Sequence, residues 1–570
     1  MQVLLPRTLL LMSPLSQTCQ ECQKSFLWTE EESHFLEQVS PKFAGETFEL
    51  PAPKLCKDCR RQTRLAWRNE RKLYYRTCDF SGKSIVSMFS TDKPYKIYRE
   101  QDWWSDKWNP LDYGRDFDFS RPFFEQFSEL MCDVPMLSRN ILLCENSDFV
   151  NGAANCKNCY LSFNLDYCED SFYVTNAKHC RSCMDCYSVK NCELCYEGID
   201  LENCYKTIFS SRSVSCSDSA FLADCLRCKN CIGCVNLVGQ EYCIFNQKVT
   251  PQEVEALKKQ LDDRAFLDDF KKKFAAYALQ FPKKYYFGHS NEDFSGDNIQ
   301  NIKASHDCYE CSELENCRNC YYLFQAKNCM DYDIFGDHSE WIYNCIAVGL
   351  NSSNNLFCYG AWNGSSQNLY CMFIGGSTNN FGCVGIKRSS YCIFNKQYSK
   401  EEYEILVARI LQHMKQTGEW GEFFPMRMSP FAYNESVAED QYPLAKSAIL
   451  DRGLRYKEED PLNSYVGPSL APPSSIAATS DEVTNGILKC EISGKSYKII
   501  PNELQLHRLM GVPLPRRCPE QRHLDRMACR NPRTLWNRNC AGCAAPIQTS
   551  YSPERPEKVL CEDCYLKTVY

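Results

Sequence analysis

Residues 144–168 read CENSDFVNGAANCKNCYLSFNLDYC, and they belong to a longer run in which cysteine returns at every twelfth position. Small or apolar residues fill most of the third positions between these cysteines. A fixed period in sequence indicates a repeated structural unit. The twelve-spaced residues are Cys132, Cys144, Cys156, Cys168, Cys180, Cys192, Cys204, Cys216 and Cys228.

The period of three predicts a narrow coil. A flat strand alternates with period two, whereas a coil of short straight runs and bends points every third residue inward. Twelve residues at about 3.3 Å each enclose a perimeter of about 40 Å, so only small side chains fit inside. Turns stacked about 4.8 Å apart would align the cysteines in one column. We therefore predict a β-solenoid of about 12 residues per turn over residues 129–248.

A second array is predicted over residues 294–397, where the grid of threes restarts near Ile299. Its phase slips between Cys329 and Cys371, which predicts longer turns or bulges there. The fold class expected is therefore mainly β with helices, built from two β-solenoid arrays and flanked by zinc-ribbon or treble-clef-like modules.

Both arrays end in YCIFN followed by a helix signal, so we expect an internal duplication. Thr250 with Glu253, and Ser399 with Glu402, form capping boxes that begin helices. The helical segments are expected within residues 249–293 and 398–485, the latter ending in a linker rich in Pro and Ser.

Two sets of paired cysteines outside the arrays have the spacing of zinc ligands. Residues 19–128 form an N-terminal module, and residues 486–570 form a C-terminal one. Four thiolates satisfy tetrahedral Zn²⁺ and leave no open position, so both sites are expected to be structural. The ligands predicted are Cys19, Cys22, Cys56 and Cys59, and Cys540, Cys543, Cys561 and Cys564.

The C-terminal module repeats the N-terminal one in altered form. Cys490 and Cys518 match Cys19 and Cys56, but Ser493 and Gln521 replace the other two ligands. We therefore expect this site to have lost zinc, with His523 as a weak substitute ligand. Of a second site in the N-terminal module, only Cys78 remains.

The chain resembles a family of uncharacterised large cysteine-rich proteins from uncultivated bacteria with small genomes. The resemblance rests on ELPAPKLCKDCR, ERKLYYRTCDFSGK, YCIFNKQYSKEEYE and TSYSPERPEKVLCEDCY, and it covers nearly the whole chain from Cys19. It implies zinc at the matching cysteine pairs but no known activity.

Each module also carries a basic segment, Lys54–Arg76 or Arg508–Arg538, although the whole chain has a net charge of −7. Such a segment either holds nucleic-acid phosphates or forms a solvated helix face. The candidate nucleic-acid contacts are Arg60, Arg61, Arg64, Arg68, Arg71, Arg516, Arg517, Arg522, Arg526 and Arg530.

Cys225, Cys228, Cys231 and Cys234 resemble a ferredoxin-type run, but the last gap is two and no Pro follows. Neighbouring turns fill the same positions with Ser and Leu, which favours buried thiols. The aromatic segment 103–127 is expected to cap the open end of the first array.

The composition of the chain restricts the other classes of protein to which it can belong. Residues 1–18 are expected to be an extension, and no apolar run is long enough for a membrane helix, so we expect a cytoplasmic protein. The eight histidines are scattered, and no catalytic motif is present. The function expected is a non-enzymatic zinc-binding scaffold for an unidentified macromolecular partner, protein or nucleic acid. The alternatives are a nucleic-acid-binding protein and a thiol-rich redox or metal-buffering protein.

Overall fold

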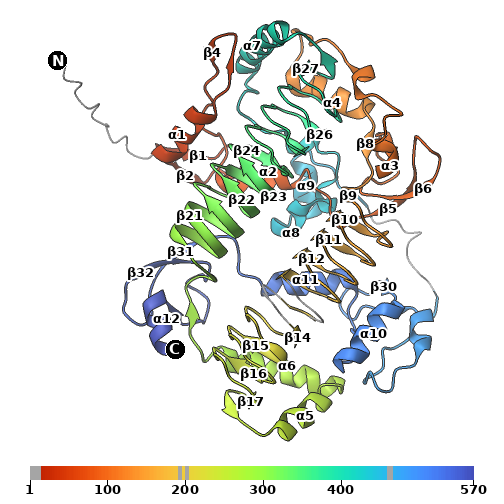
Figure 1. Cartoon of the computed structure of the whole chain (residues 1–570), viewed down its shortest axis with the longest axis vertical. Helices are drawn as coiled ribbons and strands as arrows, with labels where there is room; N and C mark the ends of the chain where they lie inside the picture. The colour runs from red at the N-terminus through yellow and green to blue at the C-terminus, as the bar shows by residue number, and fades with distance from the viewer. Residues whose placement is uncertain (1–14, 191–195, 199–204, 459–466, 570) are drawn as a thin grey trace, which may run out of the picture.

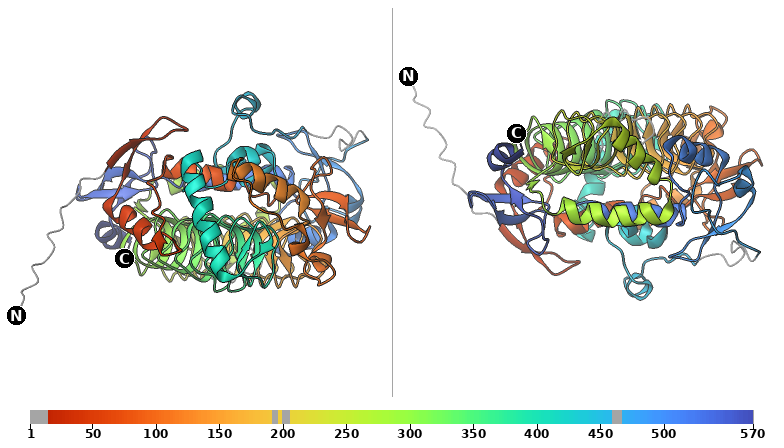
Figure 2. Two further views of the ribbon diagram at one scale, coloured as in Figure 1. Left: turned by 90° about the horizontal axis from the view of Figure 1, so that it is seen from above. Right: turned by 90° about the horizontal axis from the view of Figure 1, so that it is seen from below.

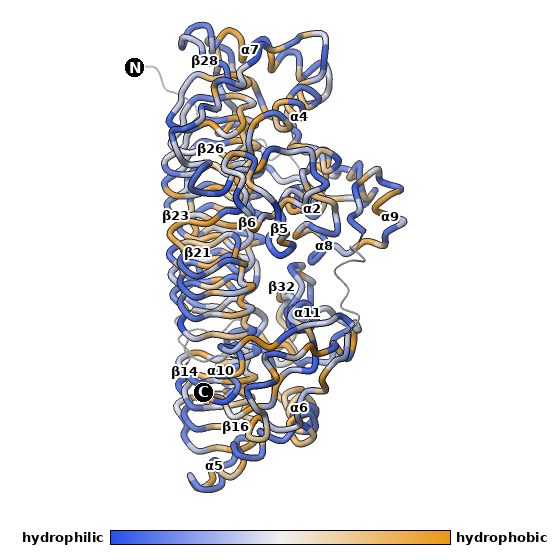
Figure 3. The backbone as a smooth tube through the Cα atoms, turned by 90° about the vertical axis from the view of Figure 1, so that its right-hand side faces the viewer, coloured by the Kyte–Doolittle hydropathy of each residue, from blue (hydrophilic) through white to orange (hydrophobic). Residues whose placement is uncertain are grey.

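The computed structural model describes residues 15–190, 196–198, 205–458 and 467–569. It is a mixed α/β fold in which two stacks of short parallel strands lie side by side (Figure 1). The first stack descends from β9 to β17 and the second rises from β21 to β26. Among the described residues, no sheet closes into a barrel. Helices and terminal modules lie on one side of the stacked coils, and the other side is left uncovered (Figures 2 and 3).

The first stack pairs strands in parallel with a register of twelve residues. Val150 lies opposite Ser162, Phe163 opposite Thr175, and Thr175 opposite Tyr187. Its strands are β9 (Ile141–Leu142), β10 (Val150–Ala154), β11 (Ser162–Asp166), β12 (Thr175–Lys178), β13 (Tyr187–Lys190), β14 (Tyr205–Ile208), β15 (Ser217–Ala223), β16 (Ile232–Val235), β17 (Cys243–Ile244) and β18 (Gln247–Lys248).

The second stack begins with a register of eleven, with Gly288 opposite Ile299, and reaches twelve where Tyr309 lies opposite Tyr321. The register becomes thirteen where Tyr343 follows Met330 and returns to twelve after Met372. The predicted slip between Cys329 and Cys371 is thus confirmed. The strands are β20 (Gly288–His289), β21 (Glu292–Glu315), β22 (Tyr321–Lys327), β23 (Met330–Glu340), β24 (Tyr343–Ile346), β25 (Tyr359–Trp362), β26 (Met372–Gly375), β27 (Cys392–Ile393) and β28 (Lys396–Gln397).

A left-handed residue precedes each inward residue and makes the corner of the coil. Asn155, Asn158, Leu161 and Asn164 have φ of 53°, 54°, 45° and 56°. Asn and Asp adopt this conformation most readily among residues with a side chain, which explains their frequency on the grid. Three residues per corner and four corners per turn give the period of twelve.

The corner leaves the N–H of the inward residue pointing into the coil, and a side chain of the preceding turn accepts it. The N–H of Cys159 donates to Ser147 Oγ at 3.0 Å, and that of Cys228 donates to Cys216 Sγ at 3.4 Å. The same side chains donate to carbonyls two residues earlier, Ser147 to Glu145 and Cys216 to Val214. A buried N–H is costly when unpaired, so Ser and Cys suit the core better than their size alone implies.

Not every predicted ladder cysteine lies in the stack. Cys132 lies near the end of helix α4 (Phe123–Asp133), because the first coil begins only after β8 (Met136–Leu137). Cys192, Cys195 and Cys204 lie outside the described residues. Cys225, Cys228, Cys231 and Cys234 are buried, and each thiol donates to backbone carbonyls.

Both predicted capping boxes are confirmed. Thr250 caps α5 (Pro251–Gln260) together with Glu253, and Ser399 caps α7 (Lys400–Thr417) together with Glu402. Helix α6 (Arg264–Ala278) then packs Phe270 against the first stack. The connection between the second stack and the C-terminal module includes α8 (Val437–Gln441) and α9 (Lys446–Asp451), and α10 (Pro501–Met510) lies within that module.

The aromatic segment does not cap the first array as predicted. It holds α3 (Glu100–Trp103), the 3₁₀ turn η1 (Pro110–Tyr113) and α4. Phe123 packs against Phe381 and Phe394 of the second stack, with ring centroids 5.4 and 5.5 Å apart.

We predict that Ser305→Ala destabilises the protein by about 1–3 kcal/mol, because it leaves a buried N–H unpaired. Ser305 is fully buried, and its Oγ accepts the N–H of Cys317 at 3.0 Å. The matched variant Ser305→Cys keeps an acceptor and should lose less. Urea unfolding followed by circular dichroism measures both, and equal losses would contradict the role assigned to the hydroxyl.

Candidate metal centres

The N-terminal thiol cluster is built from one tight hairpin and the start of one helix. Strands β1 (Leu15–Thr18) and β2 (Ser25–Trp28) carry Cys19 and Cys22 in their turn. Cys56 caps helix α2 (Lys57–Leu65), which places Cys59 in its first turn. Helix α1 (Glu30–Val39) and hairpin β3–β4 (Lys42–Phe43, Glu46–Thr47) fill the insert between the two pairs.

The C-terminal cluster repeats this construction. Hairpin β31–β32 (Trp536–Asn539, Pro546–Thr549) carries Cys540 and Cys543, and Cys561 and Cys564 begin helix α12 (Glu562–Val569). Strand β33 (Val559–Leu560) leads into that helix.

The geometry of both clusters fits Zn²⁺. Within each cluster the four sulfurs lie within 4.8 Å of one another. Cys22 Sγ lies 3.8 Å from Cys56 Sγ, and Cys543 Sγ lies 3.7 Å from Cys561 Sγ. A tetrahedron with Zn–S bonds of about 2.3 Å has edges of about 3.8 Å. The eight predicted ligands therefore converge in two groups that can bind zinc.

Backbone N–H groups favour the thiolate form that zinc needs. The N–H of Cys56 donates to Cys19 Sγ at 3.3 Å, and that of Cys561 donates to Cys540 Sγ at 3.2 Å. Burial raises the pKa of Cys540, but the N–H groups of Cys561, Cys543 and Gly542 outweigh it and lower that pKa to about 6. The hydrogen bond with Cys59 lowers the pKa of Cys56 to about 5.

Two further turns have the same backbone as the thiol clusters but other side chains. All four hairpins place a left-handed residue just before the second strand: Gln23, Gly82, Gly494 and Ala544, with φ between 59° and 68°. In each, the N–H of the first cysteine bonds the carbonyl five residues later. We call these four turns, with the helix start that faces each, the knuckles of Cys19, Cys78, Cys490 and Cys540.

The knuckle of Cys78 lies between β5 (Tyr74–Thr77) and β6 (Ser84–Ser87) and replaces metal by an ion pair. Cys78 Sγ accepts the N–H of Arg99 at 3.3 Å, as Cys540 Sγ accepts that of Cys561. Arg99 Nε lies 2.5 Å from Asp102 Oδ2, and the Cys78 thiol donates to the same oxygen. The sequence REQD at Arg99–Asp102 aligns with CEDC at Cys561–Cys564, a signal that the sequence prediction missed.

The knuckle of Cys490 lies between β29 (Leu488–Lys489) and β30 (Ser496–Tyr497), facing α11 (Pro519–Cys529). Ser493 Oγ lies 3.7 Å from Cys518 Sγ, while the Gln521 amide turns away to Asp525 at 2.9 Å. His523 is buried 3.8 Å from Asp440, and burial lowers its pKa to about 4. It therefore faces a carboxylate of α8 rather than the thiols.

Most of the predicted nucleic-acid contacts face carboxylates of their own chain. Arg60 Nε lies 2.5 Å from Asp331, and Arg64 Nε lies 2.5 Å from Asp333. Burial lowers the pKa of Arg64, but the two carboxylates outweigh it and raise that pKa. Six of the ten candidate arginines are buried: Arg60, Arg61, Arg64, Arg68, Arg522 and Arg526. A phosphate-binding surface would expose such side chains, so these six do not form one.

The C-terminal module makes the corresponding contacts. Arg522 and Arg526 of α11 both bind Asp185, at 2.5 and 2.7 Å. Arg530 binds Glu310 at 3.0 Å, and Arg68 binds Asn164 at 3.2 Å. Helix α2 thus docks on the second stack, and Arg68 beyond it reaches the first stack. Helix α11 docks on the first stack, and Arg530 beyond it reaches the second stack. Both helices lie at the centre of Figure 1.

The remaining candidate arginines are partly exposed. Arg71 donates to Thr175 Oγ1 at 3.4 Å, and Arg517 binds Glu491 and Asp525, each at 2.8 Å. Arg516 is half-buried. For Arg71, Arg516, Arg517 and Arg530, nucleic-acid contact stays a prediction.

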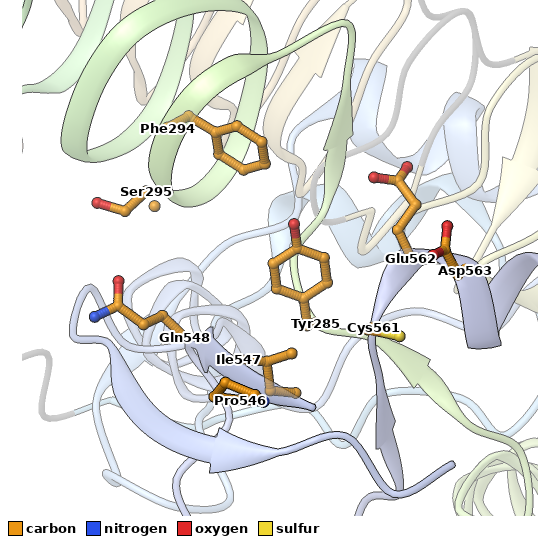
Figure 4. A pocket seen from close by; sticks show the side chains of 10 residues that line it. Tyr285, Phe294, Ser295, Pro546, Ile547, Gln548, Cys561, Glu562 and Asp563 are labelled. Atoms are coloured by element: carbon orange, nitrogen blue, oxygen red, sulfur yellow. The ribbon is translucent and has the colours of Figure 1, made fainter. Parts of the chain in front are cut away.

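One pocket of about 410 Å³ lies where the C-terminal thiol cluster meets the second stack (Figure 4). Tyr285, Phe294 and Gln548 line it beside Glu562 and Cys561. Strand β33 pairs there with β19 (Lys283–Lys284), the strand that enters the stack. In the N-terminal module, β7 (Ile97–Tyr98) pairs in the same way with β8.

Comparisons with known proteins give no identity. No protein-family model matches the chain, and no curated protein matches it. Among solved structures, one match is a "putative acetyltransferase" from Desulfovibrio desulfuricans G20, with 8% identity over 49% of this chain and 81% of that chain. Its TM-score of 0.11 carries no inference about fold or chemistry. Across the described residues, every helix is too short or too polar to cross a lipid bilayer.

We predict that Arg64→Ala destabilises the protein by about 3–5 kcal/mol, because it removes the nearest cation from buried Asp333 and leaves only Arg61 at 3.5 Å. The matched control Arg517→Ala removes a pair whose arginine side chain is 41% exposed, and it should cost about 0–1 kcal/mol. Chemical denaturation compares the two. Similarly small losses of stability in both variants would show that the ion pairs of α2 do not hold the N-terminal module on the second stack.

Proposed function

We propose that this chain is a non-enzymatic zinc-binding scaffold that presents a repeat surface to a macromolecular partner. The observation that carries the proposal is the pair of convergent four-thiol clusters, one in each terminal module. Four protein ligands fill the tetrahedral coordination of zinc, so such a site supports structure rather than substrate chemistry.

The scaffold consists of two β-solenoid arrays held by zinc-ribbon or treble-clef-like modules, and it arose by internal duplication. The matched docking contacts support this. Asp185 and Asp331 have φ of 50° and 53°, both stand just before an inward residue, and both bind arginines of a module helix. Asn164 and Glu310 likewise bind Arg68 and Arg530, the arginines that follow α2 and α11.

The surface offered to the partner is the uncovered face of the coils. Equivalent side chains of the coils recur once per turn and form partly exposed hydrogen-bonded columns. Asn146 donates to Asn158 at 3.3 Å, and Asn158 donates to Asp170 at 2.9 Å. Such regular columns suit an extended partner that contacts several turns, as in other repeat proteins. A protein partner fits best, because the buried arginines are already occupied by carboxylates.

A reducing compartment, such as the cytoplasm, suits the chemistry of the core. Most cysteines of the described residues are buried, and many of their thiols donate to backbone carbonyls. Buried thiols that hydrogen-bond backbone groups are inert packing residues rather than reactive ones.

We predict two zinc ions per chain, measured by elemental analysis of the purified protein. Cys22→Ser and Cys543→Ser should each lower the count to one, because each removes a ligand from a different cluster. The control Cys529→Ser changes an exposed thiol outside the clusters and should leave two. Protein that is folded but free of zinc would contradict the proposal.

We predict that a photoreactive amino acid at Asn316, in the outward column that continues to Asn328, crosslinks a defined macromolecule in the cells that express the chain. The matched control is Leu509 on α10, which is 69% exposed outside the coils. Mass spectrometry identifies the product. Equal, non-specific labelling at both positions would contradict the proposed role of the column.

A further inference from the structure

The four knuckles have the same backbone conformation, but they differ in the cation that their side chains contain or can bind. The knuckles of Cys19 and Cys540 each bring together four thiols that can bind Zn²⁺. The knuckle of Cys78 has its own cation, the guanidinium of Arg99, paired with Asp102. The knuckle of Cys490 has Cys518 at the position of Arg99 and Gln521 at the position of Asp102, so this ion pair is missing.

We infer that the knuckle of Cys490 is a binding site for one soft monovalent metal ion of the Cu(I) class, held by the sulfurs of Cys490 and Cys518. This inference concerns a third site and does not depend on the scaffold function proposed above.

Ser493 shows that the two thiols converge. Its N–H donates to Cys490 Sγ at 3.5 Å, and its Oγ lies 3.7 Å from Cys518 Sγ. Both sulfurs sit in a nearly closed space, since Cys490 is 3% exposed and Cys518 is 5% exposed. The arrangement matches the intact clusters, where the first thiol also faces the helix cap.

The electrostatics favour an anionic sulfur here. The N–H of Ser493 donates to Cys490 Sγ at 3.5 Å, as backbone N–H groups donate to Cys19 and Cys540 in the intact clusters. The nearby ammonium of Lys495 lies 3.0 Å from Glu520. A thiolate formed in this buried place therefore gains from a bound cation.

The donor set selects the metal. Structural zinc takes four protein ligands, and this knuckle has lost two of them. Soft thiolates prefer Cu(I) among the available ions, and the Gln521 amide is engaged by Asp525. Binding forms two Cu–S bonds, releases the remaining thiol protons to solvent and changes no oxidation state.

The test is an anaerobic titration of the reduced, zinc-loaded full chain with the Cu(I)–bicinchoninate complex, with released zinc followed by a pyridylazo dye. We expect the first equivalent of Cu(I) to transfer without zinc release. Cys490→Ser and Cys518→Ser should each abolish this first transfer while keeping two zinc ions. The matched control Cys529→Ser should retain it.

A second variant distinguishes the loss of the Cu(I) ligands from the loss of the fold. Ser493→Cys combined with Gln521→Cys restores four thiols, so it should raise the zinc count by one and replace the Cu(I) uptake. The inference is overturned if the first Cu(I) displaces zinc, if the single variants bind it as the parent does, or if Cys490 and Cys518 form a disulfide in the reduced protein. A low zinc count in the parent would instead contradict the scaffold proposal alone.

Discussion

The constraint on which this structure depends is the inward N–H at each corner of the coil. A left-handed residue turns the chain at nearly every third position, and at many corners the next N–H bonds a side chain of the preceding turn. The hydroxyl of Ser305 or the thiol of Cys345, one turn earlier, accepts it. Most of the interior is filled by side chains no longer than Leu, although Tyr332 also enters it, so most acceptors are short. Cys, Ser and Asn meet both conditions, and where Asn enters, as at Asn368 and Asn380, the amides bond one another in a buried column.

The second determinant is the set of buried arginines that joins the modules to the stacks. Desolvating a guanidinium is costly, and the cost is offset only where a carboxylate meets it in good geometry. Arg64 meets that condition at Asp333, and so does Arg522 at Asp185. Cys56 caps the helix that carries Arg64, so the N-terminal thiol cluster and the docking contact with the second stack share helix α2.

Local patterns in the sequence were enough to predict the local features. The twelve-residue register, both capping boxes and both four-thiol clusters follow from spacings within one segment. The failures involve partners distant in sequence. Arg60 looked solvent-exposed because its partner, Asp331, lies 271 positions away. Phe123 was assigned to the neighbouring array, but it packs against Phe394. Cys132 fits the period by coincidence, since the coil starts only after β8.

The two modules perform one task with different chemistry. In each, a short strand beyond the second knuckle pairs with the strand that enters an array, β7 with β8 and β33 with β19. At β33 the following residue is Cys561, a member of the C-terminal thiol cluster, whereas at β7 it is Arg99, which binds Asp102. The entry to the second array thus lies beside a cluster that can bind zinc, and the entry to the first lies beside an ion pair.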